Sequence, residues 1–343
     1  MRLQILWRTS PNRPADDDSD LMRYDLNEFA VETEFALPCD LAGCSPRAIG
    51  EADQLTIRRA SLASVPSTLR KIRPQLIYDV GDGFLLEPNT KGGMLALHID
   101  FKGRALTVDC SDDLLEVASA WVIHAGLGVA TLTHGGVPLH GAGLEVAGKY
   151  VALMAGSGAG KSTLSWFLMG QGACFGNDDL VPVRLDGEQA VAYPSVSLYP
   201  KLSREAVDGY GLDIADLLPA DYGTGEEEYY VPLPAARRVT APRLLAAVFL
   251  LRPQALPGSL FPVPRMADLV TARRLPEDEA GMTLRRNLHA AWLIEKWMDG
   301  RKLDALCRSL AARVPVYALS YPKAFALLPA LAAKVVSLAE TQA

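Results

Sequence analysis

Nine consecutive residues near the middle of the chain have the types and spacing that bind phosphate groups. The run is Ala155-Gly156-Ser157-Gly158-Ala159-Gly160-Lys161-Ser162-Thr163, a phosphate-loop pattern with Ala155 where glycine is usual. Glycines let successive backbone N–H groups approach phosphate oxygens without a Cβ clash. Lys161 is expected to reach the β- and γ-phosphates, and the Ser162 hydroxyl to ligate Mg²⁺. The run predicts a site for Mg²⁺ and a nucleoside triphosphate, ATP or GTP.

The chain on either side of this loop has the elements that such a site needs. An apolar run at 150–154 predicts a strand, and 161–170 predicts an amphipathic helix with Leu164, Phe167 and Leu168 on one face. A helix N-terminus carries partial positive charge, which favours a bound phosphate. The alternative is a glycine-rich turn that binds nothing. It does not explain why the run lies between a predicted strand and a predicted helix.

Two adjacent carboxylates, Asp178 and Asp179, follow the predicted helix and lie between apolar runs. Transfer of a phosphoryl group needs a carboxylate that accepts the proton of the attacking hydroxyl and oxygen ligands that hold Mg²⁺. At the end of a strand the two side chains would point to opposite sides, so that one could face the metal and the other the acceptor. The alternative is an Asp-Asp turn in solvent.

His140 precedes the strands that lead to the loop and is one of five histidines. Imidazole changes charge near neutral pH, so His140 is a candidate to polarise a phosphate oxygen or to position the nucleophile. The alternative is a structural histidine, and that interpretation is kept for the other four. The candidate catalytic residues are thus His140, Lys161, Asp178 and Asp179, with Ser162, Asp178 and Asp179 as candidate metal ligands.

Composition argues against several classes of partner. The net charge of −6 makes a nucleic-acid partner unexpected. The most apolar stretch, 114–132, contains Glu116 and His124 and follows Ser111, so it predicts a buried helix with a serine cap rather than a membrane span. Five irregularly spaced cysteines and an N-terminus without a signal-peptide pattern indicate a cytoplasmic protein.

The pattern of the chain predicts an α/β protein in two parts. Residues 1–110 predict a β-rich module and residues 111–343 a phosphate-loop domain whose last third is helical. The predicted strands in the first part are 29–35, 54–58, 76–80, 83–86, 95–101 and 103–108, the last two forming a hairpin. Further predicted elements are a helix at 113–132, strands at 143–146 and 150–154, and helices at 283–299, 303–312 and 322–338.

Several of these motifs resemble those of one family. His140-Gly141, the loop at 156–163 and Asp178-Asp179 follow one another as they do in bacterial HPr kinase/phosphorylase. The segment 193–201, beginning Tyr193-Pro194, and the late pair Arg286-Asn287 are similar to those of HPr-kinase-related proteins in peptide-modification gene clusters, including the lasso-peptide kinases. The resemblance covers about residues 85–335 and is most specific between 138 and 201.

The resemblance implies a fold related to phosphoenolpyruvate carboxykinase and an ATP- and Mg²⁺-dependent kinase that phosphorylates a serine of a peptide or protein. It implies that residues 156–163 bind the nucleotide, that Asp179 accepts the proton, that Asp178 supports it and that His140 belongs to the active site. Relatives form hexamers, so a homo-oligomer is possible. The acceptor and the direction of the reaction are not determined by the sequence.

Some residues that the family uses have no clear counterpart. Glu205 is the candidate for a glutamate that binds magnesium, and Arg237, Arg238 and Arg286 are candidates for an arginine that stabilises the transition state. The acidic run Glu226-Glu227-Glu228 replaces a basic pair of relatives and reads as a solvated loop or a dock for a basic peptide. Two alternatives therefore stay open: a nucleotide-binding regulator that transfers nothing, and a kinase that acts on a small molecule.

Overall fold

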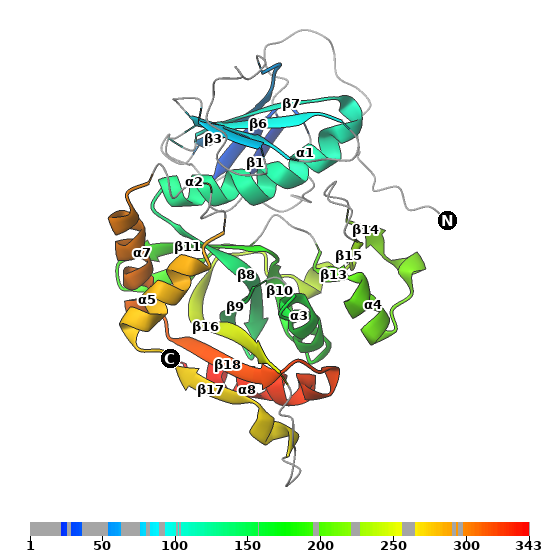
Figure 1. Cartoon of the computed structure of the whole chain (residues 1–343), viewed down its shortest axis with the longest axis vertical. Helices are drawn as coiled ribbons and strands as arrows, with labels where there is room; N and C mark the ends of the chain where they lie inside the picture. The colour runs from blue at the N-terminus through cyan, green and yellow to red at the C-terminus, as the bar shows by residue number, and fades with distance from the viewer. Residues whose placement is uncertain are drawn as a thin grey trace.

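Two β-sheets lie on opposite sides of a central helical segment in the computed structural model of the chain (Figure 1). The structure describes residues 22–25, 29–35, 54–62, 76–79, 83–88, 93–100, 102, 104–156, 158–194, 199–220, 227–255, 265–289, 293 and 298–342. The protein is therefore a mixed α/β protein, as the sequence pattern predicts.

The first sheet contains seven strands from the described residues of the N-terminal part. Its order is β1-β2-β3-β7-β6-β5-β4, with β3 parallel to β2 and β7 and the other pairs antiparallel. The predicted hairpin of β6 and β7 is confirmed. The strands are β1 (Met22–Asp25), β2 (Ala30–Thr33), β3 (Gln54–Arg59), β4 (Leu76–Asp79), β5 (Gly83–Glu87), β6 (Leu95–Asp100) and β7 (Ala105–Cys110).

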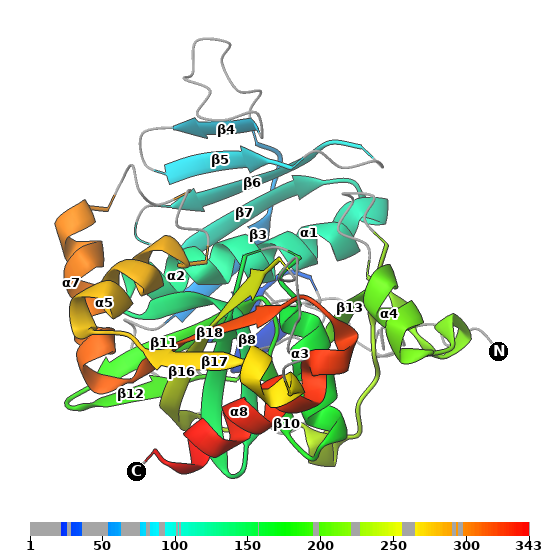
Figure 2. The same ribbon diagram turned by 60° about the horizontal axis from the view of Figure 1, so that its bottom comes forward.

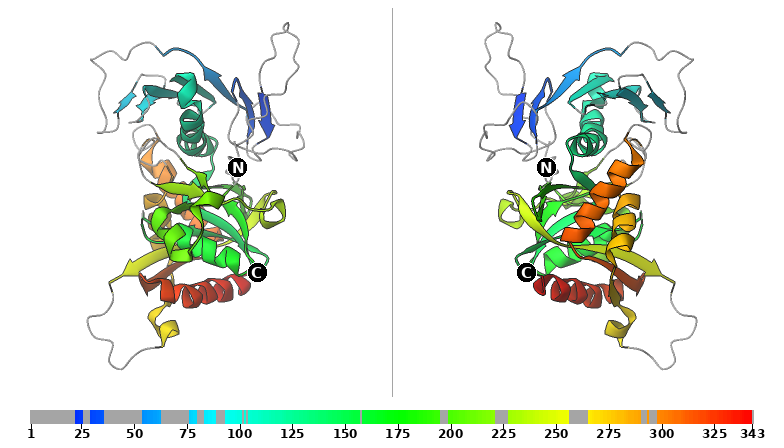
Figure 3. Two further views of the ribbon diagram at one scale, coloured as in Figure 1. Left: turned by 90° about the vertical axis from the view of Figure 1, so that its right-hand side faces the viewer. Right: turned by 90° about the vertical axis from the view of Figure 1, so that its left-hand side faces the viewer.

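A nearly continuous helical segment follows β7 and packs beneath this sheet (Figures 1 and 3). It consists of η2 (Asp112–Leu114), α1 (Leu115–Trp121), the π-helical turn η3 (Val122–Gly126) and α2 (Leu127–Thr133). The predicted helix is confirmed and is largely buried, and Ser111 occupies the N-cap position at its start as predicted, but without the side-chain hydrogen bond of a cap. The Ser111 hydroxyl makes no capping hydrogen bond, and the N–H of Leu114 bonds to the Ser111 carbonyl instead.

One hydrophobic core runs from the first sheet through this helical segment into the second sheet. It includes Leu97 of β6, Val122 of the helical segment and Val137 of the second sheet, all fully buried. Because this core is continuous across residue 110, the N-terminal sheet is packed on the rest of the chain. The division into 1–110 and 111–343 stays a prediction.

The second sheet is mixed and buried on both faces. Its order is β10-β8-β11-β12-β16-β18-β17, and β9 pairs with β8 and in parallel with β16. Residues of β9 alternate between two cores, Ala152 and Met154 facing one and Val151 and Leu153 the other. The strands are β8 (Val137–Val146), β9 (Lys149–Met154), β10 (Cys174–Asn177), β11 (Leu180–Asp186), β12 (Gln189–Ala192), β16 (Arg243–Gln254), β17 (Thr271–Arg274) and β18 (Val316–Pro322).

Two pairs of helices cover the faces of this sheet (Figures 2 and 3). The buried side chains of α5 (Glu277–Arg286) and α7 (Gly300–Arg313) join the first core, and those of α3 (Lys161–Gly170) and α8 (Leu328–Glu340) join the second. The remaining elements are β13 (Lys201–Ser203), α4 (Arg204–Tyr210), η4 (Ile214–Asp216), β14 (Leu218–Pro219), β15 (Glu228–Tyr230), η5 (Ala235–Arg237), η6 (Met266–Leu269) and η7 (Phe325–Leu327). Strands β13, β15 and β14 form a small third sheet.

The C-terminal third differs from its predicted helical character. The predicted helix at 283–299 is interrupted after Arg286, because α5 ends there and Leu288 pairs with Leu139 of β8. Leu293 is helical, and residues 290–292 and 294–297 of the predicted helix lie outside the described residues. Strands β17 and β18 were not predicted, and the last helix starts at Leu328 rather than at 322. Among the described residues, no helix has the length and apolar character needed to cross a membrane.

Candidate functional site

The predicted phosphate loop connects β9 to α3, as its sequence requires. Gly158 and Gly160 have φ angles of +71° and +92°, a region that glycine adopts without strain, and Gly160 directly precedes the first residue of α3. Tyr321 donates a hydrogen bond of 2.8 Å from its hydroxyl to the Ala159 carbonyl, which ties the loop to the end of β18. Ser157 lies outside the described residues.

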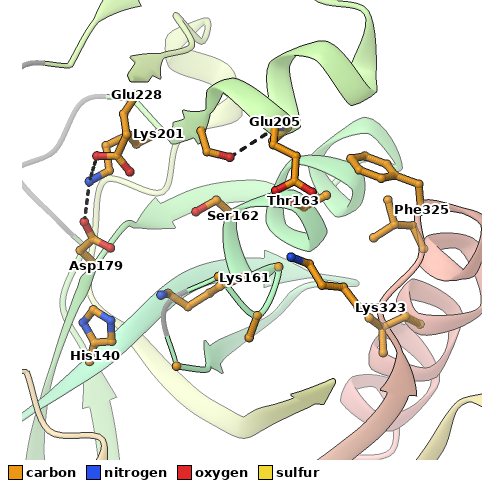
Figure 4. A pocket seen from close by; sticks show the side chains of 18 of the residues that line it. His140, Lys161, Ser162, Thr163, Asp179, Lys201, Glu205, Glu228, Lys323 and Phe325 are labelled. Atoms are coloured by element: carbon orange, nitrogen blue, oxygen red, sulfur yellow. Dashed lines mark hydrogen bonds and ion pairs between the residues drawn. The ribbon is translucent and has the colours of Figure 1, made fainter. Parts of the chain in front are cut away.

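A cavity of about 730 Å³ opens beside the loop and collects side chains from distant parts of the chain. Its walls come from the loop and α3, from β8, from the connection between β10 and β11, from β13–α4 and β15, and from the segment after β18 (Figure 4). The lining residues are Trp121, His140, Gly156, Gly158, Ala159, Gly160, Lys161, Ser162, Thr163, Asp179, Lys201, Ser203, Glu205, Ala206, Glu228, His289, Tyr321, Lys323, Ala324, Phe325, Leu328 and Leu331.

Asp178 and Asp179 form a two-residue break between β10 and β11, and their side chains have different surroundings. Asp179 lines the cavity, and its carboxylate is 3.0 Å from the Lys201 ammonium. Asp178 is buried, and its two carboxylate oxygens accept the backbone N–H groups of Asp179 and Lys201 at 3.0 and 2.8 Å. Of the two aspartates, only Asp179 therefore presents its carboxylate to the cavity.

The backbone at this break is unusual. Asp179 has a φ of +62°, which is uncommon for a residue with a Cβ, and its carbonyl accepts the N–H of Gly141 from β8 at 3.2 Å. Burial and the charge of Asp179 raise the pKa of Asp178 to about 7. The hydrogen bonds of Asp178 hold the backbone of Asp179 and of Lys201, so Asp178 positions these two residues. Its predicted role as a metal ligand stays a prediction.

Lys201 and Glu228 complete a charged cluster that the sequence did not single out as part of the site. The Lys201 ammonium lies 3.0 Å from Asp179 and 2.9 Å from Glu228, and only 13% of its side chain is exposed. Strands β13 and β15 are paired directly, with Lys201 opposite Tyr230. Glu228 therefore lies in a strand that lines the cavity, whereas its acidic run was predicted to be a solvated loop or a peptide dock. Glu226 lies outside the described residues.

His140, a candidate catalytic residue from the sequence, lines the same cavity from β8. Its backbone N–H donates to the Asn287 carbonyl at 2.9 Å, and its ring centroid is 5.6 Å from that of His289. Burial, the main cause, and the positive charges of Lys161 and Lys201 lower the pKa of His140 below its ordinary value. The ring is thus neutral at pH 7 and can donate or accept a hydrogen bond.

His289 was predicted to be structural, yet it reaches the cavity. The Arg286-Asn287 pair gives the local reason, because it ends α5 and turns the chain back onto β8. The N–H of His289 then donates to the Pro138 carbonyl at 2.7 Å. No sequence signal near His289 shows this pairing, because it depends on β8, a strand that lies far earlier in the chain.

The candidate transition-state arginines do not line the cavity. Arg237 donates hydrogen bonds to the carbonyls of Met169 and Ala173, where it holds the end of α3. Arg238 pairs with Phe175, and Arg286 ends α5. Within the described part of the chain, the cations of the cavity wall are three lysines: Lys161, Lys201 and Lys323.

Oxygen ligands suitable for Mg²⁺ are present in the cavity wall, although the described residues contain no cluster of three or more His, Cys, Asp or Glu side chains that could hold a metal ion. The wall includes the Ser162 hydroxyl and the carboxylates of Asp179, Glu205 and Glu228. Mg²⁺ usually takes one or two protein ligands and completes its shell with phosphate and water, so this set fits the ion. Glu205, a candidate from the sequence, lies in the first turn of α4.

Comparison with known proteins finds similarity among solved structures. No family model matches the chain, and no curated protein is significantly similar to it. Among solved structures, the HPr(Ser) kinase/phosphatase from Coxiella burnetii is similar, with 14% sequence identity and a TM-score of 0.30. The matched region covers 58% of this chain and 94% of that chain. A similarity of this size does not determine an activity.

Proposed function

We propose that the chain is an ATP- and Mg²⁺-dependent kinase that transfers the γ-phosphate to a hydroxyl group, in particular to a serine of a peptide or protein. The observation that carries the proposal is the cavity that joins the loop at 158–163 to the carboxylate of Asp179. A phosphate-binding loop and a carboxylate facing one space are the two parts that such a reaction needs.

Each polar residue of the wall has a role in this reaction. Lys161 and the loop N–H groups bind the β- and γ-phosphates and stabilise the charge that develops during transfer. Asp179 accepts the proton of the attacking hydroxyl, and neutral His140 beside it donates a hydrogen bond to a phosphate oxygen or orients the acceptor. Asp178 holds Asp179 and the backbone of Lys201 in place through the two hydrogen bonds described above.

Mg²⁺ would be held by Ser162 and Asp179 together with the phosphates. When bound, the ion neutralises phosphate charge. The chain itself orients the reacting groups, because the loop is fixed by Tyr321 and the carboxylate of Asp179 is fixed by Lys201. Such positioning is a main source of rate enhancement in phosphoryl transfer.

The test uses Lys161→Ala and Asp179→Asn, with Lys302→Ala as the control because Lys302 is exposed on α7, outside the cavity wall. Purified protein is incubated with γ-labelled ATP and the products of neighbouring genes. Each site variant should fold normally, as judged by circular dichroism, and should transfer phosphate roughly 10²-fold more slowly or worse. Unchanged transfer in either variant would remove the role assigned to that residue.

A second candidate function is a nucleotide-binding regulator that transfers nothing. The ion pair between Lys201 and Asp179 favours it, since a carboxylate held by an ammonium is a weaker base. Binding of ATP without turnover in the same incubation supports the regulator. Label on a metabolite rather than on a peptide supports a small-molecule kinase. A homo-oligomer and a cytoplasmic location stay predictions.

A further inference from the structure

We propose that the segment from Tyr321 to Phe325 is the second wall of the nucleotide site, in which Lys323 binds the polyphosphate and Phe325 contacts the base. This inference rests on the proposed function and deepens it. It fixes the direction in which the nucleotide lies, with the base at Phe325 and the terminal phosphate at Asp179.

The order of the strands brings this segment beside the loop. β9, β16 and β18 are parallel neighbours, so their carboxyl ends meet at one edge of the sheet, where ligands bind in open α/β sheets. The loop leaves β9 at Met154, opposite Leu250 of β16. β18 continues to Pro322, opposite Gln254, and therefore extends farther along the sheet edge. Residues after Pro322 thus lie beside the loop rather than below it.

Tyr321 shows that the two segments are in contact. Its hydroxyl, largely buried, donates to the Ala159 carbonyl within the loop at 2.8 Å. Two residues later the Lys323 side chain lines the cavity, and Figure 4 shows its ammonium pointing into the cavity below Glu205 and Thr163. The loop and Lys323 therefore face the same space from two sides.

Lys323 and Lys201 differ in their ion pairs. Lys201 is paired with two carboxylates, Asp179 and Glu228, and its charge is neutralised by them. No carboxylate of a described residue forms an ion pair with Lys323. An ammonium that projects into this cavity and forms no ion pair within the described part of the chain complements an anionic ligand. Lys323 is accordingly the second cation for the polyphosphate, beside Lys161.

Phe325 supplies an aromatic surface at the end of the cavity away from Asp179 (Figure 4). Its side chain is 41% exposed, although it is large and apolar. The ring is held edge-on to Tyr210 with centroids 5.6 Å apart, and it packs so closely on Gly209 that a Cβ there would clash with it. A fixed ring with a free face in a cavity is a platform on which a nucleobase can stack.

The neighbouring contacts connect this platform to the loop. The Tyr210 hydroxyl donates to the Thr163 carbonyl at 2.6 Å, so the ring that supports Phe325 is also bonded to the first turn of α3. In Figure 4, Thr163 lies between Ser162 and Phe325. A nucleotide whose γ-phosphate faces Asp179 would pass its β- and α-phosphates along Ser162 and Thr163 and place its base against Phe325.

The experiment compares inorganic tripolyphosphate with ATP, both with Mg²⁺, by isothermal titration calorimetry. Lys323→Met should weaken both ligands roughly tenfold, because it removes a contact to phosphate. Phe325→Ala should weaken ATP about 5- to 30-fold and leave tripolyphosphate unchanged within about twofold, because it removes a contact to the base. Phe325→Leu, which keeps packing on Gly209, should fall between the wild type and Phe325→Ala for ATP. Lys302→Met and Leu244→Ala, at exposed positions outside the cavity wall, are the matched controls.

The outcomes separate this inference from the proposed function. The proposal that residues 321–325 form the second wall is wrong if Lys323→Met binds both ligands as the wild type does. It is also wrong if Phe325→Ala and Phe325→Leu weaken the binding of tripolyphosphate as much as that of ATP. If Lys161→Ala abolishes ATP binding while all three variants of the segment bind normally, only this inference is overturned. If the wild-type protein binds neither ligand, both the proposed function and this inference are overturned.

Discussion

Replacement of Lys201 by methionine should destabilise the protein because the change leaves two carboxylates without the cation that they share. An exposed ion pair contributes about 0–1 kcal/mol, whereas loss of one partner from a fully buried pair costs about 3–5 kcal/mol. The side chain of Lys201 is 13% exposed and those of Asp179 and Glu228 are each 23% exposed, between these limits. We therefore expect Lys201→Met to lower the free energy of unfolding by about 2 kcal/mol, a value between the exposed and the buried case.

A second substitution tests the electrostatic origin of that loss. Both carboxylates contact one ammonium, at 3.0 and 2.9 Å, so their oxygens lie close to each other. At a separation of about 6 Å and an effective dielectric constant of about 20, two like charges repel by about 3 kcal/mol, which exposure to solvent reduces to about 1 kcal/mol. Glu228→Gln should therefore restore about 1 kcal/mol in the Lys201→Met protein, while it destabilises the wild type.

The assay is urea unfolding of the four proteins of this double-mutant cycle, followed by circular dichroism, with Lys302→Met as the control. It needs no knowledge of the acceptor. The reasoning is refuted if the unfolding free energies of Lys201→Met and the wild type agree within about 0.5 kcal/mol, a threshold near the limit of additivity. It is also refuted if Glu228→Gln destabilises both backgrounds equally.

Three further predictions concern the loop, the histidine and the core. Tyr321→Phe removes the hydrogen bond to Ala159 and should weaken ATP binding, measured by calorimetry, by roughly three- to tenfold. An affinity equal to that of the wild type would contradict this prediction. Because burial and two lysines lower the pKa of His140, the folded protein binds fewer protons than the unfolded chain as pH falls through about 6.5. The contribution of His140 to thermal stability should therefore fall on acidification from about pH 7 to 5, whereas the raised pKa of Asp178 acts in the opposite direction. The test is the difference between the two proteins: the wild type should lose more stability, or gain less, than His140→Gln over this range, and equal slopes would contradict the argument. Gly176→Ala would place a methyl group against the buried Tyr150 ring and should lower the free energy of unfolding by about 1–3 kcal/mol, whereas an unchanged urea midpoint would show that the ring can move aside.

Local patterns predicted the elements that carry their own signals. The helix at 161–170 has the predicted bounds, because the glycines before it, the lysine at its start and its apolar face are all local features. The hairpin of β6 and β7 and the strand pair of β8 and β9 were predicted for the same reason, since alternation and a short turn specify both partners. In the turn between β8 and β9, Ala147 and Gly148 both have positive φ, as such a tight hairpin turn requires.

Local patterns failed where a partner distant in the sequence decides the structure. Residues 316–322 form a strand buried between β16 and β17, yet a short apolar run fits a buried helix as well as a buried strand. The predicted helix at 283–299 is interrupted after Arg286 because Leu288 pairs with β8. The acidic run that contains Glu228 was predicted to be a solvated loop or a peptide dock, because nothing in the run shows that Glu228 will form an ion pair with Lys201.

The sequence by itself determined the strand–loop–helix setting of the glycine-rich loop, the position of the acidic pair and the mixed α/β character, because backbone freedom of glycine, charge and hydrophobic periodicity are properties of short segments. Only the tertiary structure decided which of the two aspartates faces the cavity and that Lys201, Glu228, His289 and Lys323 join it. The physical reason is that these side chains come from segments whose pairing partners lie far away in the chain, and strand pairing is fixed by burial of the whole sheet rather than by any one strand.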